Sequence, residues 1–360
     1  MRKNKCTLII DGNWLLISRF SVINGGFEKS SSDLVKEQSK KELQELMARS
    51  ITVVLNRFPI IDNVILVTDG GSWRKQLPVP QAISNITYKG NRSQTTELDW
   101  HYIYGALTAL AEKCKTVGMT VANHSSIEGD DWVWYWSRRL NSEGTSCIIW
   151  SSDNDLKQLV QTDLDTTAFT AWYNDKNGMW FNDGLKEEQY DDIMDYFMKP
   201  ITVKPYVLEE LQKCTRNISY VLADDIVMEK VVCGDAGDNI KSIAKTVSGK
   251  RTYKVSSKLW NEIKTELEIE TLDDFFKNKY NIVQQICKQK KFDKCPVKDI
   301  LEMFDYNVQL VWLNETVIPE TIVLYMNQCE YKVTDTSYIK SNYKVLCETN
   351  NDIESIFESI

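Results

Sequence analysis

Residues 147–155 read Cys-Ile-Ile-Trp-Ser-Ser-Asp-Asn-Asp, and this stretch decides the fold. A short apolar run followed by small polar residues and an aspartate is typical of a buried strand that ends at a polar edge. The same pattern occurs at residues 6–11 and 64–69, so that Asp11, Asp69 and Asp153 each follow a strand. Because ligands bind at the carboxyl ends of strands in open α/β sheets, these aspartates are candidates for one site.

Helical patterns separate these strands. Residues 33–58, 97–117 and 129–140 carry apolar side chains at helical spacing. The alternation predicts an α/β fold, with a mostly parallel sheet flanked by helices. Asn177-Gly178 lies between two short strand-like runs and predicts a hairpin. Beyond these runs we expect a mainly helical region, with helices at residues 221–232, 256–267, 272–279, 283–290 and 296–310.

The composition excludes several classes of protein. The chain has 360 residues, of which 42% are hydrophobic, and this suits one large or two medium domains. Its nine cysteines are scattered, form no Cys-x-x-Cys pair and are joined by only two histidines, so we expect reduced thiols and no zinc site. No apolar run approaches the roughly 18 residues of a membrane span, and we expect the protein in a cytoplasm, that of the host if it is viral.

Positive charge is concentrated although the net charge is −8. Residues 240–261 contain no Asp or Glu, and residues 88–94 are also basic. Salt screens electric fields beyond about 10 Å, so local charge and not net charge decides phosphate binding. The basic side chains of the longer stretch are Lys241, Lys245, Lys250, Arg251, Lys254 and Lys258.

Nine carboxylates lie at the ends of predicted elements, in five groups along the chain. They are Asp11; Asp69; Glu128, Asp130 and Asp131; Asp153 and Asp155; Asp235 and Asp238. Taken singly, each group is also explained as turn chemistry or as a helix cap. Gathered at one edge, they would repel one another strongly unless divalent cations were bound. Oxygen-only ligands suit Mg²⁺ or Mn²⁺, and two such ions about 3.5–4 Å apart can clamp a phosphodiester.

The ordered set of motifs resembles the 5′-3′ exonuclease/flap endonuclease superfamily, and it is most similar to the branch that holds the ribonuclease H of T-even phages. The similarity spans most of the chain. The matching stretches are residues 10–13, 67–70, 88–92, 128–131, 152–160 and 234–240. The resemblance implies a PIN/FEN-like sheet, a helical arch at about residues 88–118 and a helix–three-turn–helix element that grips duplex DNA.

The resemblance also implies domain boundaries and ligand sets. It places a nuclease domain at residues 1–232, a duplex-binding helical region at 233–315 and a C-terminal segment at 316–360. A first Mg²⁺ or Mn²⁺ ion would be served by Asp11, Asp69, Glu128 and Asp130. A second would be served by Asp131, Asp153, Asp155 and Asp235, with Asp238 nearby.

In the arch, the resemblance assigns Lys89 and Arg92 to the scissile phosphate and Tyr88 to stacking on an unpaired base. Lys241, Lys245, Lys250, Arg251 and Lys254 would bind the duplex backbone. Cellular members have a Gly-x-Gly hairpin with a monovalent cation here. This chain keeps only Gly249, which weakens the case for that ion.

The expected activity is hydrolysis of phosphodiester bonds in DNA with 5′ flaps, nicks or RNA primers, by a monomer that serves phage DNA replication. Two alternatives stay open: a PIN-type single-strand ribonuclease, and a structure-specific DNA-binding protein without activity. The apolar residues of the acidic tail, residues 350–360, have helical spacing. The tail either docks on its own domain or binds a sliding clamp; a single-strand binding protein is a further partner to consider.

Overall fold

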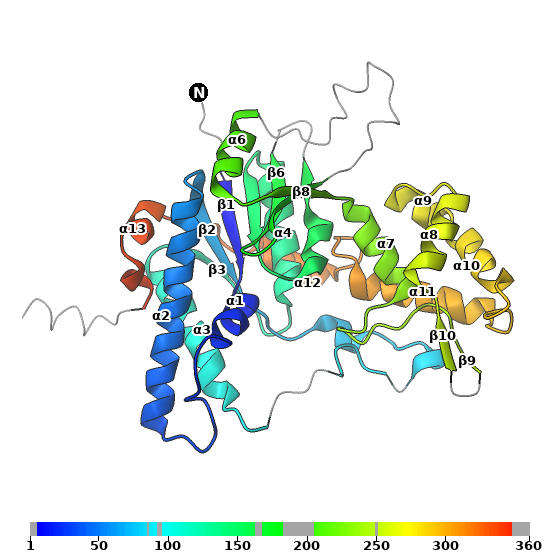
Figure 1. The fold of residues 1–360 in the computed structure, drawn as a ribbon, viewed down its shortest axis with the longest axis horizontal. Coiled ribbons are helices and arrows are strands. Elements are labelled where there is room, and N and C mark those ends of the chain that lie inside the picture. The colour runs from blue at the N-terminus through cyan, green and yellow to red at the C-terminus, as the bar shows by residue number, and fades with distance from the viewer. Residues whose placement is uncertain are drawn as a thin grey trace, which may run out of the picture. The chain divides into compact units, whose positions relative to one another are not determined.

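The computed structural model describes residues 6–84, 86–91, 96–162, 168–182, 205–248 and 251–347, and it consists of two compact units (Figure 1). Unit 1 comprises Met1–Gly71, Thr95–Val221 and Thr321–Ile360, and unit 2 comprises Ser72–Gln94 and Leu222–Glu320. Arg92, Lys250 and the tail at residues 350–360 lie outside the described residues. No helix among the described residues is long and apolar enough to cross a membrane.

Unit 1 is built on a sheet in which eight strands are seen within the described residues. The order is β3-β2-β1-β4-β6-β7-β8, with β5 paired to β6. The first five strands of this order are parallel, β7 is antiparallel to β6, and β8 is parallel to β7. The bounds are β1 Cys6–Asp11, β2 Ile61–Val67, β3 Thr120–Ala122, β4 Ser146–Trp150, β5 Gln161–Thr162, β6 Phe169–Asn174, β7 Gly178–Asn182 and β8 Ile218–Val221.

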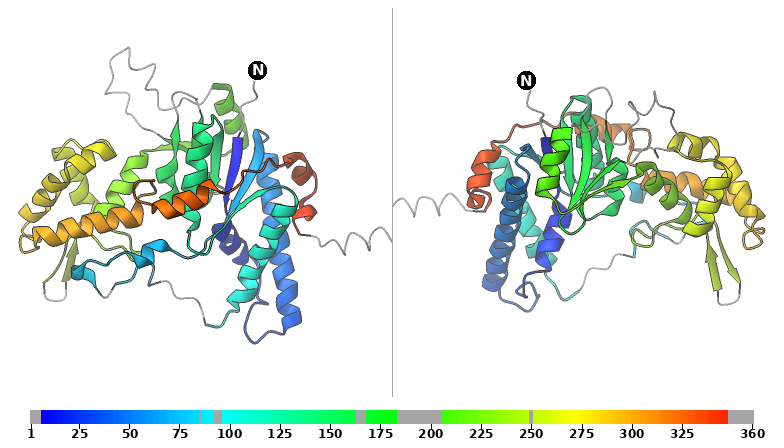
Figure 2. Two further views of the ribbon diagram at one scale, coloured as in Figure 1. Left: turned by 180° about the vertical axis from the view of Figure 1, so that it is seen from behind. Right: turned by 45° about the horizontal axis from the view of Figure 1, so that its top comes forward.

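Helices cover both faces of this sheet, as the apolar strands require. Leu8, Ile9 and Ile10 of β1 are all fully buried, which is typical of parallel strands enclosed on two sides. Helix α2 lies on one face and α4 on the other (Figures 1 and 2). The helices of unit 1 are α1 Gly12–Phe20, α2 Asp33–Arg57, α3 Trp100–Thr116, α4 Gly129–Ser142, α6 Pro205–Cys214, α12 Glu320–Asn327 and α13 Thr336–Ser341.

The register of the parallel strands aligns their carboxyl ends. Ile10 of β1 pairs with Leu66 of β2 and with Trp150 of β4, and Trp150 pairs in turn with Tyr173 of β6. The residues that follow these strands therefore emerge at one edge of the sheet. This confirms the mostly parallel α/β fold expected from the sequence, and the Asn177-Gly178 hairpin is present between β6 and β7.

The C-terminal part of the chain returns to unit 1. Asn63 of β2 donates its amide to the carbonyl of Lys332 and accepts from the N–H of Thr334, at 3.0 and 2.8 Å. Gln44 of α2 donates to the carbonyl of Leu346 at 3.0 Å. Described residues beyond Thr321 thus belong to the sheet unit, together with the first 71 residues.

Unit 2 is mainly helical around a second apolar core that includes Val231, Ile243, Trp260, Phe275 and Phe304. Its core helices are α7 Ala223–Cys233, α8 Ser257–Glu266, α9 Leu272–Lys277, α10 Lys279–Lys288 and α11 Val297–Val311. Between α7 and α8 the chain forms an antiparallel hairpin of β9 Lys245–Ser248 and β10 Arg251–Lys254. A helix–three-turn–helix element was expected here, and β-branched Thr246, Val247 and Thr252 favour the two strands.

The two units do not coincide with the expected domain boundaries. Residues 72–94, which were assigned to the nuclease domain, belong to unit 2, and so does α7. Residues 321–347, which were assigned to a separate C-terminal segment, belong to unit 1. These crossings depend on contacts between segments far apart in the sequence, which local patterns do not report.

A buried asparagine fixes the start of the hairpin region in unit 2. Asn307 of α11 is fully buried, and its amide donates to the carbonyls of Val231 and Lys241, both at 2.8 Å. The last carbonyls of a helix have no hydrogen-bond donor within the helix. The Asn307 amide is the donor for one such carbonyl of α7, that of Val231. The same amide holds the loop that follows α7.

We expect Asn307→Ala to lower the free energy of unfolding of unit 2 by about 1–3 kcal/mol, because one buried and one partly buried carbonyl lose their donor. Urea unfolding followed by circular dichroism measures this loss. Asn261→Ala, at an exposed position of α8, is the matched control and should have little effect. Equal effects of the two substitutions would contradict the role given to Asn307.

Candidate active site

Asp11 ends β1 and caps α1. Its Oδ1 accepts from the N–H of Trp14 at 3.0 Å, as an N-cap does, and its Oδ2 accepts from Ser151 Oγ at 2.7 Å. Gly12 is required directly after it, because a Cβ there would lie 2.6 Å from the carbonyl oxygen of Val67. The close approach of α1 to β2 thus sets the position of the Asp11 carboxylate.

Asp69 follows β2 and is held from two sides. Its N–H donates to Asn13 Oδ1 at 3.0 Å, and its Oδ1 accepts from the N–H of Gly129 at 2.6 Å. A Cβ on Gly129 would lie 2.8 Å from that Oδ1, so glycine permits the contact. Gly129 is the first residue of α4, whose first turn carries Asp130 and Asp131. The contact therefore brings Asp69 to the start of the helix that bears two further carboxylates.

The carboxylates of α4 differ in exposure. Asp131 is fully buried, Glu128 just before the helix is 5% exposed, and Asp130 is half-buried. A helix N-terminus carries a partial positive charge, which favours carboxylates in the first turn.

Asp153 and Asp155 lie in the turn after β4, where Ser151 connects them to Asp11. The Ser151 hydroxyl, which donates to Asp11, also accepts from the N–H of Asp153 at 3.0 Å. Asp153 Oδ1 accepts from the N–H of Asp155 at 2.9 Å. Trp172 of β6 donates its indole N–H to the Asp153 carbonyl at 3.0 Å, which fixes the turn against the sheet.

The charges of this edge act on one another. The pKa of the Asp11 carboxyl is raised to about 6. Burial is the largest cause and the charges of Asp69 and Asp153 add to it, while the hydrogen bonds from Trp14 and Ser151 act in the opposite direction. The charges of Asp69 and Asp153 thus act on Asp11, and a bound cation would offset this repulsion. Within the described ranges, however, no three His, Cys, Asp or Glu side chains form a ready-made metal site, so the ligand set stays a prediction.

The remaining predicted ligands, Asp235 and Asp238, lie in unit 2, in the loop after α7. Asp235 pairs with Lys230 at 2.5 Å and accepts from the N–H of Gly237 at 2.7 Å. Burial raises the pKa of Asp235, but these partners outweigh it and hold the pKa below its ordinary value. Asp235 is therefore ionised and fixed within unit 2, and its place beside the carboxylates of unit 1 stays a prediction.

The segment expected to begin the arch, at residues 87–91, is hydrogen-bonded to this same loop, at residues 236–239. We call this pair of segments the clamp. The N–H of Lys89 donates to the Asp238 carbonyl at 2.9 Å, and the Lys89 ammonium lies 4.0 Å from the Asp238 carboxylate. Asn91 donates to the Ala236 carbonyl at 2.8 Å, and Asn239 donates to the Thr87 carbonyl at 2.9 Å. Lys89 and Asn239 both have positive φ, 55° and 60°, so each side of the clamp contains a left-handed residue.

Tyr88 is placed differently from what its expected role requires. It is 6% exposed, it belongs to the apolar core of unit 2, and its hydroxyl donates to Asp238 at 3.4 Å. This burial does not support stacking of the ring on an unpaired base. Apart from Lys250, the predicted duplex-binding residues are described: Lys245, Arg251 and Lys254 lie on the β9–β10 hairpin, and Lys241 precedes it.

Several polar residues of the site were missed from the sequence. Ser151 and Asn13 orient Asp11 and Asp69, and Asn91 and Asn239 join the two sides of the clamp. Ser151 lay within the quoted motif, so its place between two aspartates was the available signal. The asparagine contacts join residues up to 152 positions apart, and no local pattern indicates them.

Residues 6–190 match the family model of the 5′-3′ exonuclease N-terminal resolvase-like domain. The chain belongs to the 5′-3′ exonuclease family. The resemblance of the motifs to this family is thus confirmed, and the chain is a nuclease, a hydrolase of phosphodiester bonds. A comparison with curated protein sequences finds no match.

Solved structures with the same fold come from bacteriophage T5. The chain is similar to a phage T5 flap endonuclease in complex with DNA and metal ions, with 16% identity, a TM-score of 0.54, and coverage of 94% of this chain and 100% of the other. It is also similar to the same phage protein crystallised with metal ions, with 16% identity, a TM-score of 0.52, and coverage of 95% and 100%. At this identity the likeness shows the shared fold.

In the absence of divalent cations, we expect Asp11→Asn to remove part of the pH dependence of stability. The raised pKa means that the folded state holds the Asp11 proton more tightly than the unfolded chain. The resulting stability is complete below about pH 4 and is lost as the pH rises through about 6. Asn still caps the helix but does not titrate.

Thermal unfolding of both proteins in EDTA between pH 4 and pH 7 measures the difference. The melting temperature of Asp11→Asn should rise relative to that of the wild type as the pH increases from 4 to 7. Asp33→Asn, at a side chain that is 84% exposed, is the control and should follow the wild type. Parallel curves for Asp11→Asn and the wild type would contradict the raised pKa of the Asp11 carboxyl.

Proposed function

We propose that the chain is a metal-dependent, structure-specific 5′-nuclease that hydrolyses phosphodiester bonds in DNA with 5′ flaps, nicks or RNA primers. The observation that carries this proposal is the meeting of Asp11, Asp69 and Asp153, with the pKa of Asp11 raised by burial and by the other two charges. Carboxylate oxygens are the ligands that hard divalent cations prefer. Such cations can activate a bound water without a histidine acting as the base. The family and the metal-bound structures of the phage T5 protein support it.

The proposed metal ligands are the carboxylates predicted from the sequence. One Mg²⁺ or Mn²⁺ ion would be held by Asp11, Asp69, Glu128 and Asp130, and a second by Asp131, Asp153, Asp155 and Asp235, with Asp238 nearby. When bound, the ions supply positive charge for the reacting phosphate and the leaving oxygen.

Residues behind the carboxylates restrict the orientation of the ligands. Ser151 Oγ directs one oxygen of Asp11 and the Trp14 N–H the other. The Gly129 N–H does the same for Asp69. Hydrogen bonds of this kind fix carboxylate ligands in advance, so that less rotational freedom is lost when a cation binds.

Binding of the nucleic acid is assigned to basic groups of unit 2. Lys245, Arg251 and Lys254 lie on the β9–β10 hairpin, where Lys245 and Lys254 are directly opposite each other. Like charges paired in this way disfavour the isolated hairpin and favour a bound polyanion. We assign Lys241 and Lys250 to the same backbone contacts, and Lys89 and Arg92 to the scissile phosphate. The complex of the phage T5 protein with DNA supports this assignment.

A cleavage assay on four labelled substrates tests the proposed function: a 5′ flap, a nicked duplex, an RNA/DNA hybrid and a single strand. We expect cleavage of the branched or nicked substrates that requires Mg²⁺ or Mn²⁺. Cleavage of single-stranded RNA alone would favour the PIN-type ribonuclease. Binding of the flap without cleavage under any divalent cation would favour the inactive DNA-binding protein.

We expect Asp130→Asn and Asp153→Asn each to abolish cleavage while binding of the flap persists, because the metal and the DNA backbone are held by different residues. Mg²⁺ should raise the melting temperature of the wild type and raise that of the variants less. Asp33→Asn, distant from the site in sequence and exposed, should behave as the wild type in both measurements. Full activity of either site variant at limiting Mg²⁺ would contradict the ligand assignment.

We expect Lys89→Ala to slow single-turnover cleavage by orders of magnitude and to weaken binding only slightly, since a cation at the phosphate acts mainly as charge develops in the transition state. Lys75→Ala, at an exposed position in the same segment of unit 2, is the control. A normal single-turnover rate with weakened binding would show that Lys89 is a backbone contact only.

A further inference from the structure

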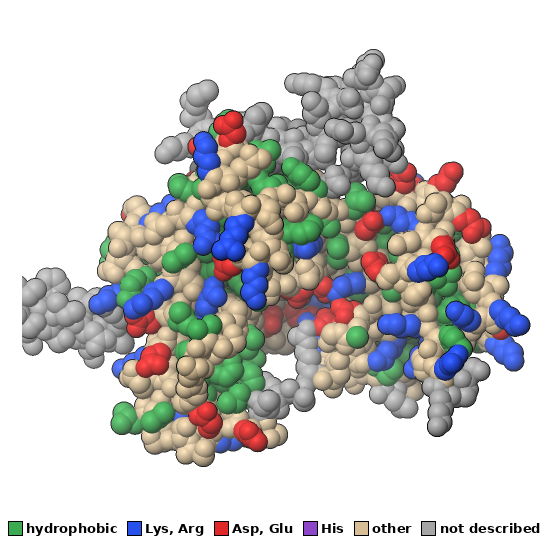
Figure 3. All heavy atoms as spheres, viewed as in Figure 1, with side chains coloured by type: hydrophobic (Ala, Val, Ile, Leu, Met, Phe, Trp, Pro, Cys, Tyr) green, Lys and Arg blue, Asp and Glu red, His purple; other side chains and the backbone are tan. Residues whose placement is uncertain are grey.

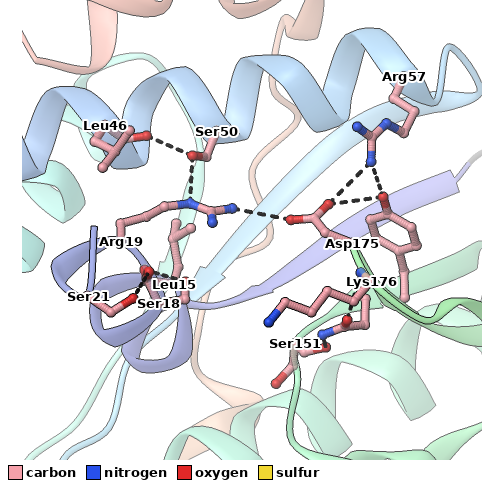
Figure 4. A network of polar contacts seen from close by, with 12 residues as sticks. Leu15, Ser18, Arg19, Ser21, Leu46, Ser50, Arg57, Ser151, Asp175 and Lys176 are labelled. Carbon is pink, nitrogen blue, oxygen red and sulfur yellow. Dashed lines mark hydrogen bonds and ion pairs between the residues drawn. The ribbon is translucent and has the colours of Figure 1, made fainter. Parts of the chain in front are cut away.

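The turn between β6 and β7 carries charged side chains at the carboxylate edge of unit 1. Asp175 and Lys176 belong to this turn, Arg19 comes from the last turn of α1, and Arg57 ends α2. Figure 4 shows Arg19 and Arg57 reaching Asp175 from two different helices. We name these four residues the turn cluster.

The turn cluster is held rigidly by hydrogen bonds. Arg19 Nη2 and Arg57 Nη1 lie 3.2 and 3.3 Å from different oxygens of Asp175. Arg19 Nε donates to Ser50 Oγ at 2.7 Å, and Arg57 also donates to the Tyr173 hydroxyl. The guanidinium groups are therefore positioned before any ligand binds, which lowers the entropy lost on binding.

One carboxylate does not neutralise this cluster. The turn cluster contains three cationic side chains and one carboxylate. Tyr173, which donates to Asp175 at 3.0 Å, stays uncharged because burial and the Asp175 charge raise its pKa to about 12. The side chains of Arg57 and Asp175 are 38% and 35% exposed, and Lys176 is exposed. In Figure 3, Lys and Arg side chains gather over this face of unit 1. The net charge of +2, from three cations and one carboxylate, is thus partly exposed to solvent.

The turn cluster is joined to the carboxylates by a short path of hydrogen bonds. The N–H of Lys176 donates to Asn174 Oδ1 at 2.9 Å, and the Asn174 amide donates to the Ser151 carbonyl at 3.3 Å. Ser151 in turn donates to Asp11 at 2.7 Å. Since Tyr173 is in register with Trp150 and Trp150 with Ile10, the turn emerges at the same edge as Asp11.

We propose that the turn cluster binds backbone phosphates of the nucleic acid strand that occupies the carboxylate edge. This inference rests on the proposed function and gives the site a contact within unit 1, besides the basic hairpin of unit 2. Fixed guanidinium groups suit phosphate oxygens, and contacts to the backbone position a strand without reading its sequence. The alternative is that the turn cluster only stabilises the β6–β7 hairpin, in which case Lys176 does not contact the nucleic acid.

Lys176→Gln is the sharpest test, because Lys176 is exposed and its only hydrogen bond given by the structure comes from the backbone N–H. Lys332→Gln is the matched control. This exposed lysine of unit 1 donates its backbone N–H to Thr120 of β3, which β2, β1 and β4 separate from β6 in the sheet. Binding of a labelled 5′ flap is measured by fluorescence anisotropy in Ca²⁺ at several salt concentrations.

We expect Lys176→Gln to weaken binding several-fold and to reduce the slope of log affinity against log salt by about 0.7–0.9, the value for one lost phosphate contact. Arg57→Gln should act in the same direction, with its melting temperature measured to separate loss of folding from loss of binding. Lys332→Gln should match the wild type.

Wild-type slopes for both Lys176→Gln and Arg57→Gln, in a protein that binds and cleaves the flap, would overturn the turn-cluster proposal and leave the proposed function intact. An equal loss of slope in Lys332→Gln would also overturn it, since the effect would then reflect overall charge. Failure of the wild type to bind or cleave any of the four substrates would overturn both proposals.

Discussion

The repulsion between Asp11, Asp69 and Asp153 is the constraint on which the rest of unit 1 depends. Parallel strands in register bring these side chains to one edge, and burial adds to the cost of the Asp11 charge. The apolar strands behind them, enclosed on both faces, provide the stability that tolerates this cost. Hydrogen bonds from Trp14, Ser151 and Gly129 then fix where each carboxylate points.

In unit 2, the carboxylates of the loop after α7 have lysine partners, and neutral amides hold the backbone of the loop. This loop holds Asp235 and Asp238, and it is bounded by Asn307 on one side and by the segment around Lys89 on the other. Left-handed backbone costs a residue other than glycine roughly 1 kcal/mol, yet Lys89 and Asn239 both adopt it. The contacts across the clamp compensate for this cost, and they tie a proposed phosphate-binding lysine to the loop that carries two of the proposed metal ligands.

The strands and the aspartates that follow them could be predicted because both signals are local. A run such as Ile148-Ile149-Trp150 is too apolar to lie anywhere but inside, and the next polar residues must lie at the sheet edge. The β9–β10 hairpin was missed, because a basic stretch was interpreted by its charge and not by its β-branched residues. The burial of Tyr88 and the bridge made by Asn307 depend on segments distant in sequence, so no pattern within one window could indicate them.

The return of residues 330–347 to unit 1 has a consequence for synthesis on the ribosome. Strand β3 is at the edge of the sheet, and the backbone of Lys332 meets it through Thr120 at 2.8 Å. An uncovered edge strand is a template for pairing with other chains. Since the covering segment is translated after all of unit 2, the nascent sheet waits with an open edge while more than two hundred further residues emerge. Translation speed and chaperone access during that interval, rather than the final stability, would then set the yield of correctly folded protein.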